Sequence, residues 1–208
     1  MAGKPQYAIL LDGGFVTKVL EQKLHRFPEA ADIAAECARI SSHADLAQYD
    51  LLRIYFYDAE PLSAVIRNPV SGVTLNLGNT PVYANHKSLL DKLELTPNFA
   101  VRLGVTMIHG WRLGSQATRR LAKNPRPPTQ QDFVPHIEQK GVDLRIGLDI
   151  ARLALREKVR TIVAVTGDSD LVPAFKFARR EGVRVYLDTL GRSSRVRREL
   201  KAHADIVL

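Results

Sequence analysis

Short apolar runs alternate along the chain with segments whose apolar residues recur at helical spacing. The apolar runs are residues 7–11, 51–57, 162–165 and 183–187. Their content of Ile, Val, Tyr and Phe favours β-strands. The clearest helical segments are residues 15–24, 30–43 and 142–157. Because unbroken apolar strands are typical of sheets covered on both faces, the alternation predicts an α/β sandwich around a mainly parallel sheet of about five or six strands.

The middle of the chain departs from this pattern. From residue 58 onward the sequence is dense in Pro, Gly and Asn. We therefore expect a single domain over residues 1–208, with an irregular insertion at about residues 58–135. Within the insertion, residues 87–95 have the pattern of a short helix and residues 99–113 that of one or two strands. The polar, Pro-rich stretch that follows them is expected to be a mobile loop.

Acidic residues directly follow two of the predicted strands. Asp12 comes after residues 7–11, and Asp168 and Asp170 come after residues 162–165 with Ser169 between them. Ligands of open parallel sheets bind at the carboxyl ends of the strands, so these acids are expected at one edge of the sheet. The alternative is that they only cap helices and shape turns, and Ser169 is as well explained by a turn as by a site.

The predicted helix at residues 142–157 carries two further acids. Asp143 lies at or just before its first turn, where the helix dipole alone would favour a carboxylate. Asp149 lies in mid-helix among apolar neighbours. Either it faces solvent beside the arginines of the same helix, or it points to the other acids at the edge of the sheet.

A cluster of carboxylates at one edge predicts a metal site. Oxygen-only ligands suit Mg²⁺ or Mn²⁺, and a divalent cation makes the mutual repulsion of several carboxylates tolerable. One or two such ions, roughly 3.5–4 Å apart if there are two, would activate water and stabilise the leaving oxygen in phosphodiester cleavage. The six histidines show no H-E-x-x-H spacing, and no convincing Ser/His/Asp or Cys/His set is present.

The charge balance favours a polyanionic partner. Lys and Arg number 30 against 22 Asp and Glu, which gives a formal net charge of +8. Phosphate contacts from basic side chains give affinity without sequence choice, so a nucleic acid is a candidate partner. Solvated basic surfaces are the alternative. The candidate phosphate contacts are Arg119, Arg120, Lys123, Lys140, Arg192, Arg195 and Arg198.

Other features bound the class of protein. Cys37 is the single cysteine, so no intramolecular disulfide forms and a reducing compartment is expected. No run of about 18 apolar residues is present, so we expect a cytoplasmic protein without a membrane partner and leave pairing into a homodimer open. Tyr83, His109 and Trp111 are candidates for stacking on bases, although aromatic residues in strands more often belong to the core.

Four segments carry a family resemblance. They are AILLDGGF at 8–15, RIYFYDA at 53–59, QKGVDLRIGLDIARLA at 139–154 and VAVTGDSDLVPAFKFARREGVRVYL at 163–187. In order and spacing they resemble the NYN domains of the PIN-like nuclease superfamily, in particular the LabA-like branch. Leu171 stands where many members have Phe after the GDSD motif.

The resemblance implies a PIN-like three-layer α/β/α sandwich with a metal-dependent ribonuclease site. Matched position by position, it implies that Asp12, Asp143, Asp168 and Asp170 are metal-site acids, and Asp149 matches an acid frequent in the family. The resulting hypothesis is an endoribonuclease that depends on Mg²⁺ or Mn²⁺. The alternative is a non-catalytic RNA-binding or regulatory module. A phosphatase of the haloacid-dehalogenase type is less favoured, because that chemistry needs a second Asp where this chain has Gly14.

Overall fold

The computed structural model describes residues 3–208, which form a central sheet of seven strands in the order β6-β5-β2-β1-β7-β8-β9. The strands are β1 (Gln6–Asp12), β2 (Asp50–Ala59), β5 (Phe99–Leu113), β6 (Phe133–Lys140), β7 (Thr161–Val165), β8 (Arg184–Asp188) and β9 (Ile206–Val207). All neighbouring pairs run parallel except β5 and β6, which are antiparallel. The sheet is therefore mainly parallel, as predicted, and slightly larger than the expected five or six strands.

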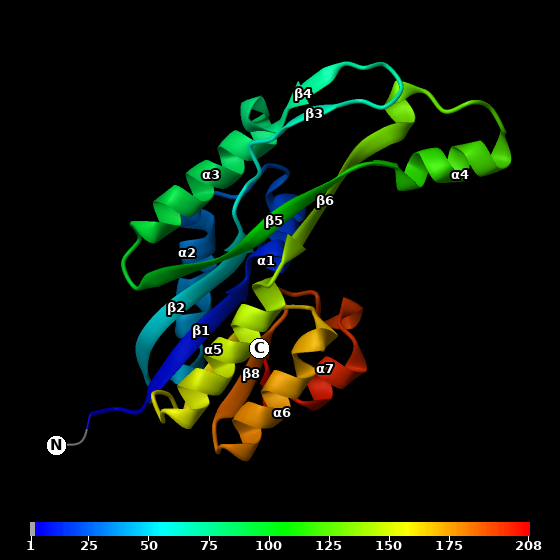
Figure 1. The fold of residues 1–208 in the computed structure, drawn as a ribbon. Helices are drawn as coiled ribbons and strands as arrows, with labels where there is room; N and C mark the ends of the chain where they lie inside the picture. The colour runs from blue at the N-terminus through cyan, green and yellow to red at the C-terminus, as the bar shows by residue number, and fades with distance from the viewer. Residues whose placement is uncertain (1–2) are drawn as a thin grey trace.

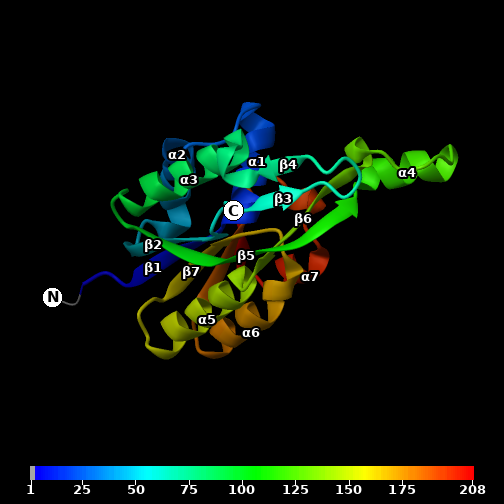
Figure 2. The same ribbon diagram turned by 45° about the horizontal axis from the view of Figure 1, so that its top comes forward.

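Helices cover both faces of this sheet (Figure 1). One face carries α1 (Gly13–Leu24), α2 (Ala30–Ser41) and α3 (Pro81–Glu94), and the other carries α5 (Val142–Leu155), α6 (Val172–Arg180) and α7 (Arg198–Ala202). Figure 2 shows the three layers with the sheet between the two groups of helices. The three-layer α/β/α sandwich is confirmed. Within residues 3–208, no helix has the length and apolar character needed to span a bilayer.

Strand β1 shows how the sequence builds the two cores. Tyr7, Ile9 and Leu11 pack with the helices α1 to α3, whereas Ala8 and Leu10 pack with α5 and α6. All five side chains are at most 3% exposed. Successive side chains of a strand point to opposite faces, so a strand that is buried on both sides must be apolar at every position. This is why an unbroken apolar run predicts the strand correctly.

The segment 58–135 is more regular than the irregular insertion that the sequence suggests. A hairpin of β3 (Val65–Arg67) and β4 (Thr74–Asn76) leads into α3, which begins at Pro81 and is capped by the Thr80 side chain. Strand β5 then pairs with β2 inside the central sheet and continues beyond it as a two-stranded ribbon with β6. The helix expected at residues 87–95 is present but begins earlier, at Pro81, because the fixed φ angle of Pro suits the first position of a helix.

The stretch expected to be a mobile loop contains α4 (Ser115–Lys123), at the outer end of the β5–β6 ribbon (Figures 1 and 2). The return to β6 is held by Asp132, which is 1% exposed. Its carboxylate accepts two hydrogen bonds from the Arg126 guanidinium, at 2.8 and 2.9 Å, and one from the Thr129 amide. The bonds from Arg126 hold the pKa of Asp132 well below its usual value. This ion pair orders a segment whose own composition predicts a loop.

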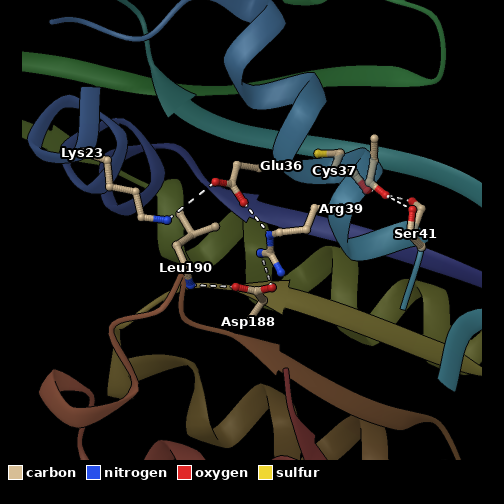
Figure 3. A network of polar contacts seen from close by, with 9 residues as sticks. Lys23, Glu36, Cys37, Arg39, Ser41, Asp188 and Leu190 are labelled. Carbon is tan, nitrogen blue, oxygen red and sulfur yellow. Dashed lines mark hydrogen bonds and ion pairs between the residues drawn. The ribbon is translucent and has the colours of Figure 1, made fainter. Parts of the chain in front are cut away.

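A polar network joins α2 to the end of β8 (Figure 3). Arg39 donates to Oδ2 of Asp188 at 2.6 Å and to Glu36 at 2.7 Å. The other carboxylate oxygen of Asp188 accepts the amide hydrogen of Leu190 at 2.6 Å. Asp188 is 1% exposed, so a buried carboxylate is satisfied on both oxygens. The network fixes the start of the loop 189–197, which borders the site described next.

Candidate active site

Asp12 lies at the junction of β1 and α1. Its Oδ1 accepts the amide hydrogen of Phe15 at 3.1 Å, so Asp12 is the N-cap of α1. Its Oδ2 accepts a hydrogen bond of 2.9 Å from the Thr166 hydroxyl. The register of β1 and β7 explains this contact. Leu11 pairs with Val165, so Asp12 and Thr166, the residues that follow them, lie side by side at the ends of the two strands. Asp12 therefore does cap α1, and its carboxylate lies at the edge of the sheet.

Thr166 is a site residue that the motifs did not identify. It is 1% exposed, and its hydroxyl donates to Asp12 while accepting the amide hydrogen of Asp168 at 3.0 Å. One hydroxyl thus connects acids from two neighbouring strands. The sequence contains one sign of this contact: Asp12 and Thr166 each follow directly after an apolar run. This sign becomes informative only once the two strands are known to pair.

The GDSD motif forms a tight turn after β7. Oδ1 of Asp168 accepts the amide hydrogen of Asp170 at 2.9 Å and caps the short helix η4 (Ser169–Leu171). Asp168 is half-buried and Asp170 is exposed. The Ser169 hydroxyl accepts a hydrogen bond of 3.2 Å from Arg197. The turn therefore holds the Asp168 carboxylate against the Asp170 amide, whereas the Asp170 side chain is exposed.

Electrostatics link these acids with Asp143. The pKa of Asp12 is raised to about 6. Burial is the main cause, and the negative charges of Asp143 and Asp168 add to it, whereas the hydrogen bonds from Phe15 and Thr166 lower the pKa. The pKa of Asp143 is also raised, first by burial and then by the charges of Asp168 and Asp170. Asp143 lies in the first turn of α5, whose N-cap is Gly141. The acid cluster of Asp12, Asp143, Asp168 and Asp170 is therefore a set of mutually repelling groups drawn from three segments.

The acid cluster is not a preformed coordination shell. Over the described residues 3–208, no three His, Cys, Asp or Glu side chains stand close enough to hold one ion together. The donors are nonetheless all carboxylate oxygens, the chemistry that suits Mg²⁺ and Mn²⁺. Asp143 and Asp170 are exposed, so their side chains are free to turn toward an ion. The donor set fits a divalent cation, and binding would require these side chains to close around it.

A groove of about 680 Å³ joins the acids to basic side chains. Asp12, Asp168 and Asp170 line it together with three arginines from the loop after β8. These arginines are Arg192, Arg195 and Arg197. Two of the candidate phosphate contacts, Arg192 and Arg195, therefore lie beside the acids. Arg197 lines the groove, whereas the candidate Arg198 next to it is exposed at the start of α7 and does not.

The other candidate phosphate contacts do not line this groove. Arg119, Arg120 and Lys123 belong to α4 at the outer end of the ribbon, and a guanidinium nitrogen of Arg120 is 3.8 Å from a carboxylate oxygen of Asp132. The Lys140 ammonium is 3.5 Å from a carboxylate oxygen of Glu138. Arg119, Arg120 and Lys123 form a separate basic surface, because β5 and β6 carry α4 away from the body of the protein (Figure 1). Lys140 lies at the other end of the ribbon, where β6 leads into α5.

Asp149 takes neither of the two positions considered for it. It is only 15% exposed, and its Oδ2 accepts a hydrogen bond of 3.0 Å from the Tyr57 hydroxyl. Its carboxylate also forms ion pairs with Arg102 at 3.5 Å and Arg152 at 3.0 Å. Burial, reinforced by the charge of Asp149, raises the pKa of the Tyr57 hydroxyl, which therefore stays a donor. The structure thus places Asp149 in a network on the flank of the sheet rather than in the acid cluster.

We expect the substitution Asp149→Asn to leave RNA cleavage within about twofold of wild type. The amide can still accept from Tyr57, and the two arginines that lose their partner are each 42% exposed and can turn to water. The free energy of unfolding should fall by about 1 kcal/mol. Urea denaturation and a cleavage assay on the same preparation measure both quantities. A loss of cleavage without a loss of stability would indicate that Asp149 does belong to the metal site.

Comparisons with known proteins identify the family and the fold of the chain. The profile of the NYN domain family matches residues 79–207, more than half of the chain. The chain belongs to the NYN domain family. NYN domains are nuclease-like, so the groove lies in a fold associated with nucleic-acid cleavage. The NYN match spans the positions of Asp143, Asp168 and Asp170 but begins after β1 and β2, so Asp12 lies outside it.

A similar fold occurs in the crystal structure of a protein of unknown function from Vibrio parahaemolyticus RIMD 2210633. The TM-score is 0.54 at 15% sequence identity, and the match covers 100% of this chain and 95% of that one. At this identity the similarity concerns the fold alone. No curated protein matches the sequence at a significant level.

Proposed function

We propose that this NYN protein is an endoribonuclease of the LabA-like branch that depends on Mg²⁺ or Mn²⁺. The observation that supports the proposal best is the groove in which mutually repelling carboxylates face three arginines. The acids would hold the cation, and the arginines would hold the phosphates of the RNA strand. Acids alone or arginines alone occur in many proteins. Phosphodiester cleavage requires both in one groove, the acids for the cation and the arginines for the phosphates.

The acids of the cluster and the arginines of the groove have separate tasks in this proposal, although Asp143 is not among the residues that line the groove. Asp12, held by Thr166 and by the α1 amide of Phe15, would provide a fixed cation ligand, and Asp143, Asp168 and Asp170 would complete the set. When bound, the cation would supply an activated water and would stabilise the leaving oxygen. The arginines would bind phosphates on both sides of the scissile bond and offset the repulsion between RNA and the acids. Arg197 also orients Ser169 at the edge of the groove.

We further propose that the whole chain acts as one domain. β1 carries Asp12 and lies outside the family match, yet it occupies the centre of the sheet between β2 and β7. Removing it would take one acid from the cluster and divide the sheet. A cytoplasmic location and pairing into a homodimer stay predictions from the sequence.

An RNA cleavage assay tests the proposed function. We expect purified protein with Mn²⁺ to cleave labelled single-stranded or structured RNA, and cleavage to stop in EDTA and in the double variant Asp12→Asn/Asp168→Asn. Asp149→Asn is the matched control, because it removes the same charge outside the groove. Cleavage that survives in the double variant would show a contaminating nuclease. Tight RNA binding without metal-dependent cleavage of any RNA would favour the non-catalytic module.

A further inference from the structure

A second cavity lies on the far side of Gly13 and Gly14 from the carboxylate groove. Its volume is about 320 Å³, at the lower end of the range for small-molecule sites. The walls come from the segment after β2, the start of α3 and the two strands of the ribbon. The apolar side chains among them include Leu62, Leu77, Val82 and Ile137. The space therefore suits one small, largely apolar group.

One end of this cavity carries fixed polar groups. His86 and Gln139 both line it, and both are held by Asp58, which is 1% exposed. Oδ2 of Asp58 is 2.8 Å from Nε2 of His86, and Oδ1 accepts a hydrogen bond of 3.2 Å from the side-chain amide of Gln139. Within residues 3–208, the second ring nitrogen of His86 and Oε1 of Gln139 make no hydrogen bond to the protein. The Tyr83 ring lies one helical turn from His86 in the same wall.

The cavity and the groove meet at the N-terminus of α1. Oε1 of Gln139 is 4.0 Å from the point where a Cβ of residue 14 would stand, and Oδ1 of Asp12 is 3.6 Å from the same point. Oδ2 of Asp58 is 2.9 Å from the corresponding point at residue 13. Gln139 therefore stands between the cavity and the acid that would hold the cation. A strand whose phosphate lies at the acids would carry its neighbouring base to this opening.

We propose that the 320 Å³ cavity binds one unpaired nucleobase of the RNA strand, next to the phosphate held at the acid cluster. A base has two apolar faces and a polar edge, which match the apolar walls, the Tyr83 ring and the exposed hydrogen-bonding atoms of His86 and Gln139. A base inside a duplex is covered by its stacked neighbours and by its pairing partner, so the cavity selects single-stranded RNA. This inference rests on the proposed function for its substrate.

Affinity measured in EDTA tests the base cavity without using cleavage. We expect a fluorescent single-stranded RNA to lose about tenfold in affinity when one particular nucleotide is made abasic, and to change little for abasic sites elsewhere. Leu62→Trp, which fills the cavity, and Tyr83→Ala, which removes the ring, should each weaken the intact RNA and abolish the abasic effect. Val73→Trp is the matched control, because Val73 is 61% exposed in the β3–β4 hairpin and does not line the cavity.

Crosslinking and competition complete the test. RNA with 4-thiouridine at the sensitive position should crosslink to the peptide that contains Tyr83 and His86. Competition by nucleoside monophosphates at micromolar concentration would assign the cavity to a free nucleotide and overturn the inference. Equal abasic effects at all positions, with unchanged affinity in Leu62→Trp and Tyr83→Ala, would also overturn it while leaving ribonuclease activity in place. Absence of Mn²⁺-dependent cleavage would overturn the proposed function, and the affinity scan in EDTA would still decide whether a base binds.

Discussion

Replacing Asp12 by Asn should reduce Mn²⁺-dependent RNA cleavage by about a thousandfold and, without metal, make the protein more stable at neutral pH. The loss of activity follows if the carboxylate is a cation ligand, since a correctly held metal ion contributes several kcal/mol to transition-state stabilisation. Asn keeps an oxygen for the amide hydrogen of Phe15, so α1 stays capped. The two effects have opposite signs, so unfolding of the variant cannot explain both.

The gain in stability comes from the pKa of Asp12. Burial raises this pKa in the folded protein from the usual 3.8 to about 6. Between pH 4 and pH 6 the folded state therefore holds a proton that the unfolded state has released, and the free energy of unfolding falls as the pH rises through this window. Above pH 6 the loss amounts to at most about 3 kcal/mol. Asn carries no charge and avoids most of this loss, so we expect a gain of about 1–2 kcal/mol at pH 7.5 and none below pH 4.

Urea denaturation in EDTA at pH 4 and pH 7.5 measures this gain, and thermal unfolding with added Mn²⁺ measures metal binding. Mn²⁺ should raise the melting temperature of the wild type and raise that of Asp12→Asn much less. The control variant Asp149→Asn should show no gain at pH 7.5, because its charge is already compensated by Arg102 and Arg152. A destabilised Asp12→Asn variant at pH 7.5, or equal Mn²⁺ shifts in both proteins, would contradict this account of Asp12.

Replacing Gly13 by Ala is expected to lower the free energy of unfolding by about 3 kcal/mol or more. A Cβ at residue 13 would stand 2.5 Å from the backbone oxygen of Tyr57 and 2.9 Å from both the Asp58 carboxylate and the Phe56 ring. All three neighbours belong to β2 and are at most 1% exposed, so none can turn aside. The methyl group would force α1 away from the central sheet, and Asp12 would move with it.

Gly14→Ala is the matched control for this substitution. The nearest atoms to a Cβ at residue 14 are 3.6 and 4.0 Å away, which is ordinary contact, and Ala favours the helix over Gly. Its stability should equal or slightly exceed that of the wild type. Urea denaturation of the three proteins under identical conditions provides the comparison. Similar stabilities for Gly13→Ala and Gly14→Ala would show that α1 can shift without loss.

The sequence by itself determined the layered fold and the position of the acids. Strands such as β1 and β7 are buried on both faces, so their unbroken apolar runs predict buried strands. The acids that follow these strands must then lie at the same edge of a parallel sheet. The charge pattern around Arg192 and Arg195 likewise belongs to a local segment. These features depend on neighbours in the chain, which is why the pattern of residues was sufficient.

Only the tertiary structure decided which distant side chains meet. Asp149 lies outside the acid cluster because it accepts a hydrogen bond from the Tyr57 hydroxyl, 92 residues away in the sequence. The Thr166 hydroxyl donates to Asp12 across 154 residues. The Asp58, His86 and Gln139 contacts that shape the second cavity arise in the same way. Helical spacing and strand alternation fix the face on which a side chain lies, whereas its partners depend on strand order, register and packing, which have no local signal.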